Sequence, residues 1–371
     1  RRVSYLDLSS ISKTYDGRVH AVKELDLAVA EGEIVALLGS SGCGKTSTLR
    51  MIAGFEEVTS GAIALRGKDI HLLPPAQRGV AMAFEGYSLY PPLTVRENIA
   101  FALKAERLRS AEVAERVAEV AHLVEIEDIL ERYPSSISGG QQQRASLARA
   151  LIRTAALHLL DEPMGQLEPQ LRALLRGRIK HFIQERGLTA ILVTHDQTEA
   201  NALADRIAVM EDGELQQFDT PEALKGYPAN LFTGTFIGEP PMNVFEAGIQ
   251  TMDDRLAFVL KEGSTLDYAR TDFSPALFER LSGSEGVTVV VRPHAVRIAE
   301  GGLKARVTVN QWLGDQTHLA AAFAGGTIVS VTHDRAPISE GDTISIAIAS
   351  EDLHLFNSAS GAAISHGGQL A

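Results

Sequence analysis

The sequence predicts an α/β fold with a mostly parallel core sheet, followed by a second, β-rich domain. Two observations predict the first part: the apolar run IVALL (34–38) is typical of a strand buried on both faces, and amphipathic helical segments alternate with such strands. One observation predicts the second part. Beyond Gly238-Glu239-Pro240-Pro241 the chain becomes a series of short β-rich runs separated by Gly and Asp. At 371 residues, 45% of them hydrophobic, the chain is long enough for two domains with sizeable cores.

The elements of the first part follow in chain order. VSYLDLSS (3–10) and LDLAVAEGEIVALLG (25–39) read as strands around glycine turns, and a helix is expected from Lys45 to about Met51. Within residues 104–130, valines spaced by four, three and four residues predict an amphipathic helix. A second helix repeats this pattern before ILVT (191–194), which returns to a buried strand. The two helical patterns are carried by Val113, Val117, Val120 and Val124, and by Leu171, Leu174, Leu175, Ile179 and Phe182.

The second part has little helical pattern, and a small antiparallel barrel or sandwich is the simplest interpretation. Its β-rich runs are GVTVVVRP (286–293), ARVTVNQW (305–312), GTIVSVTHD (326–334) and DTISIAIAS (342–350). We therefore expect an α/β domain over 1–237 with a helical subdomain at about 86–155, and an all-β domain over 238–356. The small, polar residues of 357–371 predict a flexible tail.

Charge and cysteine content exclude some classes of partner. A net charge of −12 and a pI near 5.4 argue against binding to a nucleic-acid backbone, because no Lys/Arg stripe is present to displace counterions. The single cysteine, Cys43, cannot form an internal disulfide, which favours a reducing, cytosolic compartment. No apolar run approaches the roughly 20 residues that a membrane span needs. If the protein works at a membrane, a partner must hold it there.

A phosphate-binding loop is predicted by Gly39-Ser40-Ser41-Gly42-Cys43-Gly44-Lys45-Thr46, which matches G-x-x-x-x-G-K-[ST]. The glycines let backbone N–H groups wrap nucleotide phosphates, Lys45 reaches the β- and γ-phosphates, and the Thr46 hydroxyl binds Mg²⁺. The alternative is a glycine turn without a ligand. Cys43 reads as a small residue that presents its N–H rather than as a redox sensor. The predicted binding residues are Gly39, Ser40, Ser41, Gly42, Cys43, Gly44, Lys45, Thr46 and Ser47.

A pair of acids ends the apolar run Leu157-His158-Leu159-Leu160-Asp161-Glu162. Asp161 is predicted to hold Mg²⁺, directly or through water, and Glu162 to orient and polarise an attacking water. A strand that ends in two solvated acids is the alternative. Behind a phosphate-binding loop, the pair indicates phosphoryl transfer to water.

A second anion-binding helix start is predicted by Ser138-Gly139-Gly140-Gln141, where a serine cap and two glycines precede a helix. One chain has no obvious use for a second phosphate site, whereas a head-to-tail dimer has. In such a dimer each cap closes on the γ-phosphate bound by the other chain. The run Gln141 to Gln143 has a simpler alternative as a solvated helix start.

With these motifs in this order, the chain resembles the ATP-binding-cassette (ABC) ATPases, and more narrowly the ATPase subunits of maltose- and glycerol-phosphate-type bacterial importers. The resemblance covers nearly all of residues 3–356. Tyr15 matches the aromatic residue that stacks on adenine, Ser138–Gln141 the family signature, and His195 the switch histidine that contacts the γ-phosphate. The alternatives are a half-buried strand aromatic for Tyr15 and a structural role for His195. IGEPPMN (237–243), VRPHAVRI (291–298) and WLGD (312–315) resemble the accessory barrel of this subgroup.

The resemblance implies ATP and Mg²⁺ as cofactors and a second ATPase subunit as partner, in a homodimer or a heterodimer. It implies docking to the coupling helices of transmembrane permease subunits, through the 85–95 stretch and the helical subdomain. An extracytoplasmic solute-binding protein is then an indirect partner, and the chain is peripheral to the cytoplasmic face of the inner membrane. The implied function is uptake of a carbohydrate, polyol or glycerol phosphate. Core packing of 85–95, a non-transport ABC ATPase and a regulatory binder are the alternatives.

Two positions depart from the family pattern. Glu85 stands where Gln is usual, so it keeps an oxygen ligand for Mg²⁺ but adds a negative charge near Asp161 and Glu162. We expect Thr46, Glu85 and Asp161 to be the metal ligands. Gly165-Gln166-Leu167-Glu168 replaces the usual Ser-x-Leu-Asp. Three interpretations remain: full activity, one half of a heterodimer, or an ATP-binding site that hydrolyses poorly.

Overall fold

The computed structural model describes residues 4–284 and 286–367 of the chain, which forms two compact units. Contacts divide the chain between Pro221 and Glu222, earlier than the boundary expected after residue 237. The difference arises because α7 (Pro221–Gly226) and α8 (Leu231–Phe236) precede the β-rich unit and α8 packs within it: the backbone N–H of Leu231 donates to the Gly361 carbonyl at 2.8 Å. In the part of the chain that is described, no helix is long and apolar enough to span a membrane.

The central sheet of the first unit has six strands in the order β10-β9-β3-β8-β7-β6. All neighbouring strands are parallel except β10, which runs antiparallel to β9. Every residue of β3, β7 and β8 is buried, as expected for apolar strands covered on both faces. The carboxyl ends of the parallel strands therefore share one edge, where ligands of such sheets bind. The strands are β3 (Ile34–Gly39), β6 (Val80–Ala83), β7 (Leu157–Asp161), β8 (Ala190–Thr194), β9 (Arg206–Glu211) and β10 (Glu214–Asp219).

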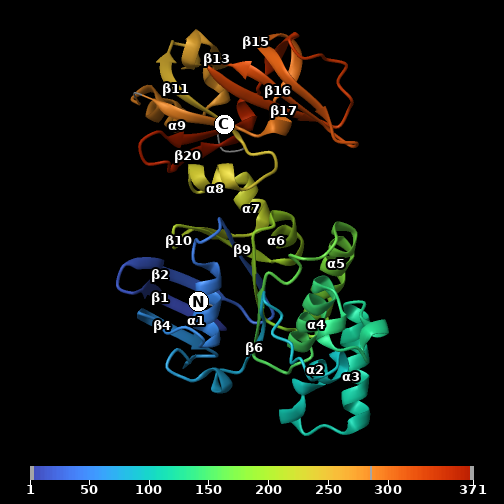
Figure 1. The fold of residues 1–371 in the computed structure, drawn as a ribbon. Helices are drawn as coiled ribbons and strands as arrows, with labels where there is room; N and C mark the ends of the chain where they lie inside the picture. The colour runs from blue at the N-terminus through green and yellow to red at the C-terminus, as the bar shows by residue number, and fades with distance from the viewer. Residues whose placement is uncertain (1–3, 285, 368–371) are drawn as a thin grey trace. The chain divides into compact units, whose positions relative to one another are not determined.

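A four-stranded antiparallel sheet in the order β2-β1-β4-β5 packs over the same core. Leu6 and Leu25 from this sheet are fully buried with Leu37 of β3 and with Leu49 of α1 (Lys45–Ala53). The blue part of Figure 1 shows this sheet beside α1. Its strands are β1 (Leu6–Tyr15), β2 (Val19–Val29), β4 (Ser60–Leu65) and β5 (Lys68–Asp69).

Five further α-helices complete the first unit. The predicted helix within 104–130 is α3, in which Val117 and Val120 are buried, and the second predicted helix is α5. Leu175, Ile179 and Phe182 of α5 are buried as the pattern requires, but Leu174 is 45% exposed. The helices are α2 (Val95–Phe101), α3 (Ser110–Leu123), α4 (Gly139–Leu151), α5 (Pro169–Glu185) and α6 (Gln197–Leu203).

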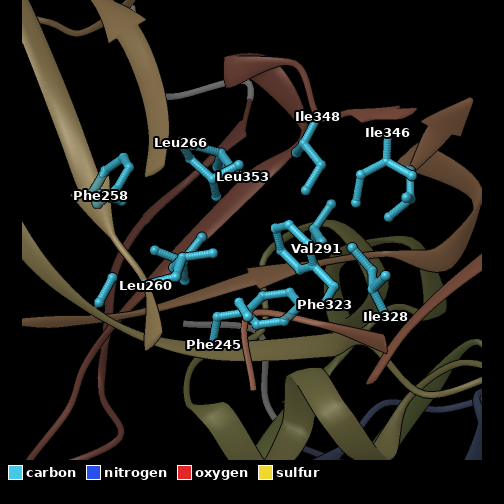
Figure 2. Close-up of a cluster of buried hydrophobic side chains, with 14 of the residues drawn as sticks. Phe245, Phe258, Leu260, Leu266, Val291, Phe323, Ile328, Ile346, Ile348 and Leu353 are labelled. Carbon is cyan, nitrogen blue, oxygen red and sulfur yellow. The ribbon is translucent and has the colours of Figure 1, made fainter. Parts of the chain in front are cut away.

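The second unit consists mainly of two antiparallel sheets, in the orders β13-β12-β11-β14-β19-β20 and β17-β16-β15-β18. Side chains of both sheets form one hydrophobic core, part of which Figure 2 shows, with Phe245, Phe323 and Ile346 among its members. A helix that the sequence pattern did not predict, α9 (Pro275–Ser282), buries Leu277, Phe278 and Leu281. The strands are β11 (Asn243–Thr251), β12 (Arg255–Val259), β13 (Thr265–Ala269), β14 (Val287–Val291), β15 (Arg297–Trp312), β16 (Thr317–Phe323), β17 (Gly326–Thr332), β18 (Thr343–Ala347), β19 (Leu353–Asn357) and β20 (Ala363–His366).

The segment expected to be a flexible tail differs from that expectation in its described part. Strand β20 pairs antiparallel with β19, with His366 opposite His354. The two imidazoles lie in contact, Nδ1 to Nδ1 at 3.0 Å, and the His366 ring also packs edge-on against Phe356. These nonlocal ring contacts order a segment whose composition alone predicts disorder. Residues 368–371 of the expected tail lie outside the described residues.

Candidate nucleotide-binding and catalytic site

The predicted phosphate-binding loop connects the carboxyl end of β3 to the first residue of α1, Lys45. Gly44 has a φ of 99°, in the left-handed region, and a Cβ built on it lies 2.3 Å from the Ala21 carbonyl oxygen. A Cβ built on Gly39 lies 2.2 Å from the Met210 carbonyl oxygen. Both positions therefore exclude side chains for steric reasons, and the loop closes over the start of α1 with its N–H groups available to an anion.

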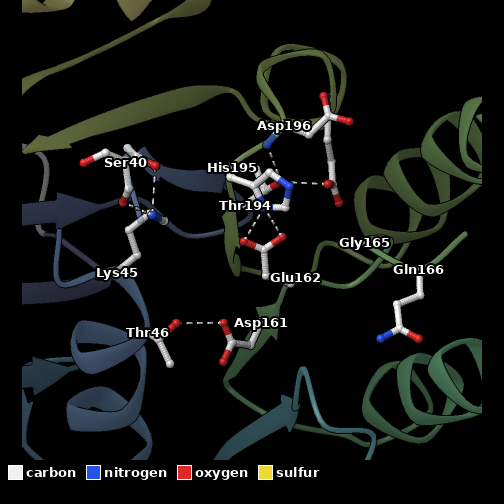
Figure 3. Close-up of polar contacts among 12 residues, drawn as sticks. Ser40, Lys45, Thr46, Asp161, Glu162, Gly165, Gln166, Thr194, His195 and Asp196 are labelled. Atoms are coloured by element: carbon white, nitrogen blue, oxygen red, sulfur yellow. Dashed lines mark hydrogen bonds and ion pairs between the residues drawn. The ribbon is translucent and has the colours of Figure 1, made fainter. Parts of the chain in front are cut away.

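The buried ammonium group of Lys45 lies inside this loop. Its Nζ donates to the carbonyls of Gly39 at 2.9 Å and Ser40 at 2.7 Å, so the positive charge is fixed within the loop (Figure 3). Cys43 is also buried, and burial raises the pKa of its thiol. A protonated thiol is a weak nucleophile, which favours the packing interpretation of Cys43 over a redox role.

The two predicted acids leave the end of β7 in different directions. The Thr46 hydroxyl donates to the Asp161 carboxylate at 3.3 Å, so two of the three residues predicted as metal ligands meet across β7 and α1 (Figure 3). Burial, followed by the negative charge of Glu85, raises the pKa of Asp161 to about 6. A divalent cation would offset both effects. A hydroxyl beside a carboxylate is a donor set that suits Mg²⁺.

Glu85 itself lies exposed in the loop that follows β6. It acts on Asp161 through its charge, and the structure records no hydrogen bond between the two among the described residues. Nor does any group of three or more His, Cys, Asp and Glu residues in that part of the chain have the geometry of a metal site. Mg²⁺ usually takes few protein ligands and completes its shell with phosphate and water. The role of Glu85 as a ligand remains a prediction.

Glu162 and His195 meet at the same edge of the sheet, although 33 positions separate them in the chain. His195 follows β8, and its Nδ1 lies 2.9 Å from the Glu162 carboxylate (Figure 3). The Glu162 backbone N–H donates to the Val193 carbonyl at 2.9 Å. The His195 side chain is 68% exposed, whereas that of Glu162 is 16% exposed. The arrangement gives an oriented carboxylate beside a solvent-facing imidazole, as water activation requires.

Tyr15 closes the other side of the loop. Its hydroxyl donates to the Ser47 hydroxyl of α1 at 3.3 Å, and the Lys13 ammonium lies 4.9 Å from its ring centroid. The ring is half-buried at the end of β1. This places Tyr15 next to the phosphate-binding helix, where the predicted stacking on a base requires an aromatic ring.

The predicted signature cap has the expected local form. Ser138 and Gln141 form a reciprocal capping box: the Gln141 N–H donates to the Ser138 hydroxyl at 3.3 Å, and the Ser138 N–H donates to the Gln141 side chain at 3.0 Å. Gly139 and Gly140 lie against Gln166 and Leu167. Among the described residues, the neighbours recorded for Gly139 and Gly140 also include Tyr87, and none belongs to the phosphate-binding loop of their own chain. The contact of this cap with nucleotide therefore remains a prediction for a second subunit.

Comparison with known proteins gives the family. Residues 22–165 match the model of the ABC transporter family, and residues 289–356 match that of the TOBE domain. The chain is 38% identical over 365 residues to the sn-glycerol-3-phosphate import ATP-binding protein UgpC of Cereibacter sphaeroides, covering 96% of this chain and 98% of the relative. It is 37% identical to the trehalose import ATP-binding protein SugC of Mycobacterium tuberculosis, covering 91% of this chain and 86% of the relative.

The chain belongs to the ABC transporter family. The fold agrees: a dimeric ATP-binding cassette in a post-hydrolysis state with ADP and Pi superposes with a TM-score of 0.55 at 28% identity, over 58% of this chain and 98% of that one. The predicted resemblance, the P-loop α/β fold and the ATPase activity are thereby confirmed. The predicted all-β C-terminal domain is confirmed over residues 289–356, which match the TOBE domain, whereas α7, α8 and α9 lie outside that match.

One residue of this ABC ATPase's site was missed by sequence reasoning. Gln143, interpreted as part of a solvated helix start, is only 4% exposed, and its amide bonds to Glu162 and Gln166. A signal was present: Gln143, Leu147 and Leu151 recur every four residues along α4, and all three are buried on one face. A polar residue in line with buried leucines predicts a satisfied interior amide.

Proposed function

We propose that this chain is the ATP-hydrolysing subunit of a bacterial importer for a carbohydrate, a polyol or a glycerol phosphate. The observation that carries the proposal is the convergence of Lys45, the Thr46–Asp161 pair and the Glu162–His195 pair at one edge of a parallel sheet. Relatives named for glycerol-3-phosphate and trehalose import support the solute class, since they match more than nine tenths of this chain.

The mechanism follows from the positions of these side chains. The loop N–H groups and Lys45 bind the β- and γ-phosphates, while the Glu162 carboxylate accepts a proton from the water that attacks the γ-phosphorus. His195 keeps the Glu162 carboxylate oriented and, because its ring is exposed, can also contact the γ-phosphate. Thr46 and Asp161, with Glu85 as a further candidate, would hold Mg²⁺, which neutralises developing charge on the phosphates.

A second ATPase subunit completes the site in this proposal. The Ser138–Gln141 cap is a helix N-terminus whose capping box leaves the N–H groups of Gly139 and Gly140 without a recorded partner among the described residues, and it faces neighbours of its own chain other than the phosphate-binding loop. A head-to-tail dimer, like the dimeric cassette that superposes on this chain, would bring the cap to the other subunit's nucleotide. Both a homodimer and a heterodimer satisfy this geometry.

A groove in the first unit supports docking of a permease coupling helix. Its volume is about 530 Å³, and Tyr90 and Phe101 form part of its lining with ring centroids 4.7 Å apart. Tyr90 is 43% and Phe101 38% exposed, so these rings are not core residues. The groove includes two residues of the 85–95 stretch that the sequence analysis assigned to docking, Ser88 and Tyr90. An amphipathic helix fits such a groove, which would place the subunit at the cytoplasmic face of the membrane without a span of its own.

Affinity purification from detergent-solubilised membranes tests the proposal. We expect integral membrane proteins to co-purify with the wild type, and Tyr90→Ser to lose them while the purified variant still hydrolyses ATP. Tyr133→Ser, which alters an exposed tyrosine outside the groove, is the matched control and should keep them. Recovery of nucleic acid in place of membrane proteins would instead indicate a non-transport ABC ATPase.

The Glu162→Gln variant tests the dimer in the same preparation. With saturating ATP it should bind nucleotide without hydrolysis and should form a dimer, because the cap of one chain closes on the nucleotide of the other. A variant that binds ATP yet stays monomeric, alone and beside its membrane partners, would contradict the dimer.

A further inference from the structure

The side chain of Gln143 connects two parts of the catalytic edge. Its Nε2 donates to the Glu162 backbone carbonyl at 2.7 Å, and its Oε1 accepts from the Gln166 backbone N–H at 3.0 Å. Gln143 lies in the first turns of α4, the helix whose start is the signature cap. A single buried amide therefore bonds both to the catalytic glutamate and to the segment 165–168 that follows it.

Glu162 needs such support, because its backbone is held in an uncommon conformation. Its φ is 47°, in the left-handed region that a residue with a side chain rarely adopts. Conformations of this kind cost about 1–3 kcal/mol and persist where surrounding bonds fix them. Here the N–H of Glu162 is fixed by Val193 of β8 at 2.9 Å, and its carbonyl accepts from Gln143 of α4 at 2.7 Å and, at a longer 3.3 Å, from the Gly165 N–H.

The segment 165–168 is held from its other side by Arg172 of α5. The Arg172 guanidinium donates to the carbonyls of Gly165 at 3.3 Å and Leu167 at 3.1 Å. It also pairs with the Asp196 carboxylate at 3.0 Å, and Asp196 is the neighbour of His195. Gln143 and Arg172 thus fix this segment between α4 and α5, and Figure 3 shows Gly165, Gln166 and Asp196 around the Glu162–His195 pair.

We propose that Gln143 is a positioning residue for ATP hydrolysis. Its amide holds the Glu162 carbonyl and the 165–168 segment together and thereby sets the direction of the Glu162 carboxylate. The inference concerns hydrolysis itself and does not depend on which solute is imported. An amide suits the position because one planar group must donate to a carbonyl and accept from an N–H. The carboxylate of a glutamate can only accept hydrogen bonds. The thioether of a methionine, which has a similar length, donates none and accepts only weakly.

Steady-state ATPase kinetics of Gln143→Met test the proposal. A misplacement of about 1 Å can cost about 100-fold in rate, so we expect kcat to fall about 10- to 100-fold. KM for ATP should change less than about twofold, because binding by the phosphate-binding loop does not involve Gln143. Gln142→Met is the control: Gln142 also donates its amide to backbone carbonyls, those of Pro134 and Ile137, and makes no recorded bond to Glu162 or to 165–168. Its kcat should stay within about twofold of the wild type.

The Gln143→Glu variant adds a readout that a purely structural role does not move. Near neutral pH the new carboxylate lacks a donor for the Glu162 carbonyl, so kcat falls. Protonation at lower pH restores an O–H donor, so the ratio of variant to wild-type kcat should rise as pH falls. Unchanged kcat in Gln143→Met would overturn the proposal. So would a joint loss of kcat, ATP affinity and thermal stability with no recovery of Gln143→Glu in acid.

Discussion

Replacing Glu199 by glutamine is expected to make the first unit more resistant to unfolding at alkaline pH. Glu199 lies in α6, the helix that follows His195 in the chain, and is only 1% exposed. Its Oε2 accepts from the Thr194 hydroxyl at 2.8 Å, while its Oε1 is buried with no partner among the described residues. Burial above all, with the negative charges of Asp196 and Glu162, raises the pKa of Glu199 from its ordinary value of 4.5 to about 7.

The sign and size of the effect follow from this pKa. Between pH 4.5 and about 7 the folded chain holds a proton on Glu199 that the unfolded chain does not, so raising the pH favours unfolding. The stability contributed by Glu199 is thus fully present below pH 4.5 and is lost as pH rises through about 7. A difference of 7 − 4.5 = 2.5 units, at about 1.4 kcal/mol each, corresponds to about 3 kcal/mol of unfolding free energy. Glutamine cannot titrate, so Glu199→Gln should lose this dependence.

Urea unfolding of both proteins across this pH range measures the effect. The quantity to compare is the unfolding free energy of the variant minus that of the wild type, which should increase by about 3 kcal/mol from about pH 4.5 to about pH 8.5. Any pH-independent loss of unfolding free energy in the variant, such as that caused by an amide N–H without a partner, cancels in this comparison. Circular dichroism follows the helices, and the emission of Trp312, the single tryptophan, reports the second unit separately.

A matched control for the loss of one carboxylate is Glu115→Gln, at an exposed position of α3. If Glu199→Gln and the wild type respond to pH in parallel, within about 1 kcal/mol, Glu199 is not the buried titrating group that the structure indicates.

Three further predictions concern single side chains. Glu85→Gln should raise the Mg²⁺ concentration for half-maximal ATPase rate about 3- to 10-fold, because a carboxylate is lost beside a hard cation; superimposable Mg²⁺ curves would remove a metal role for Glu85. Tyr15→Ala should raise KM for ATP about tenfold, from the loss of stacking on the base, while Tyr15→Phe should keep it; equal effects of both variants would contradict stacking. Burial lowers the pKa of His158 from 6.5 to about 4, so its contribution to stability is present above pH 6.5 and is lost as pH falls toward 4. The unfolding free energy of His158→Phe should therefore fall by about 3 kcal/mol less than that of the wild type over this pH range, as measured by circular dichroism.

The parts of the site that the sequence predicted are those encoded by local patterns. The phosphate-binding loop is a contiguous motif whose glycines are required by φ angles and close contacts at the same positions. Asp161 and Glu162 end an apolar run that is a buried strand, and His195 follows another. The contact between Glu162 and His195 follows from β7 and β8 being neighbours in the sheet, an order that the sequence did not predict.

What could not be predicted depends on which surfaces meet in three dimensions. For Gln143 a solvated helix start was the alternative left open, because the packing of α4 against the 165–168 segment is a tertiary contact that the sequence does not reveal. The buried state of Glu199 has the same origin, since a charged residue near a helix start is ordinarily exposed. The expected tail became strand β20 through the pairing of His354 with His366, residues that carry no such signal separately.

The interpretations of Glu85 can be weighed against this geometry. A subunit that binds ATP but hydrolyses poorly should show a defect in the groups that activate water, yet Glu162 retains its contact with His195 and its backbone is fixed at both polar atoms. The negative charge of Glu85 acts on Asp161 and on the neighbouring Tyr87, and it helps to raise the pKa of both. A bound divalent cation offsets this rise in pKa, because it favours the ionised form of the carboxylates around it. Glu85 should therefore change how much Mg²⁺ the site needs rather than the rate at saturating Mg²⁺, and this favours an active subunit over a weakened one.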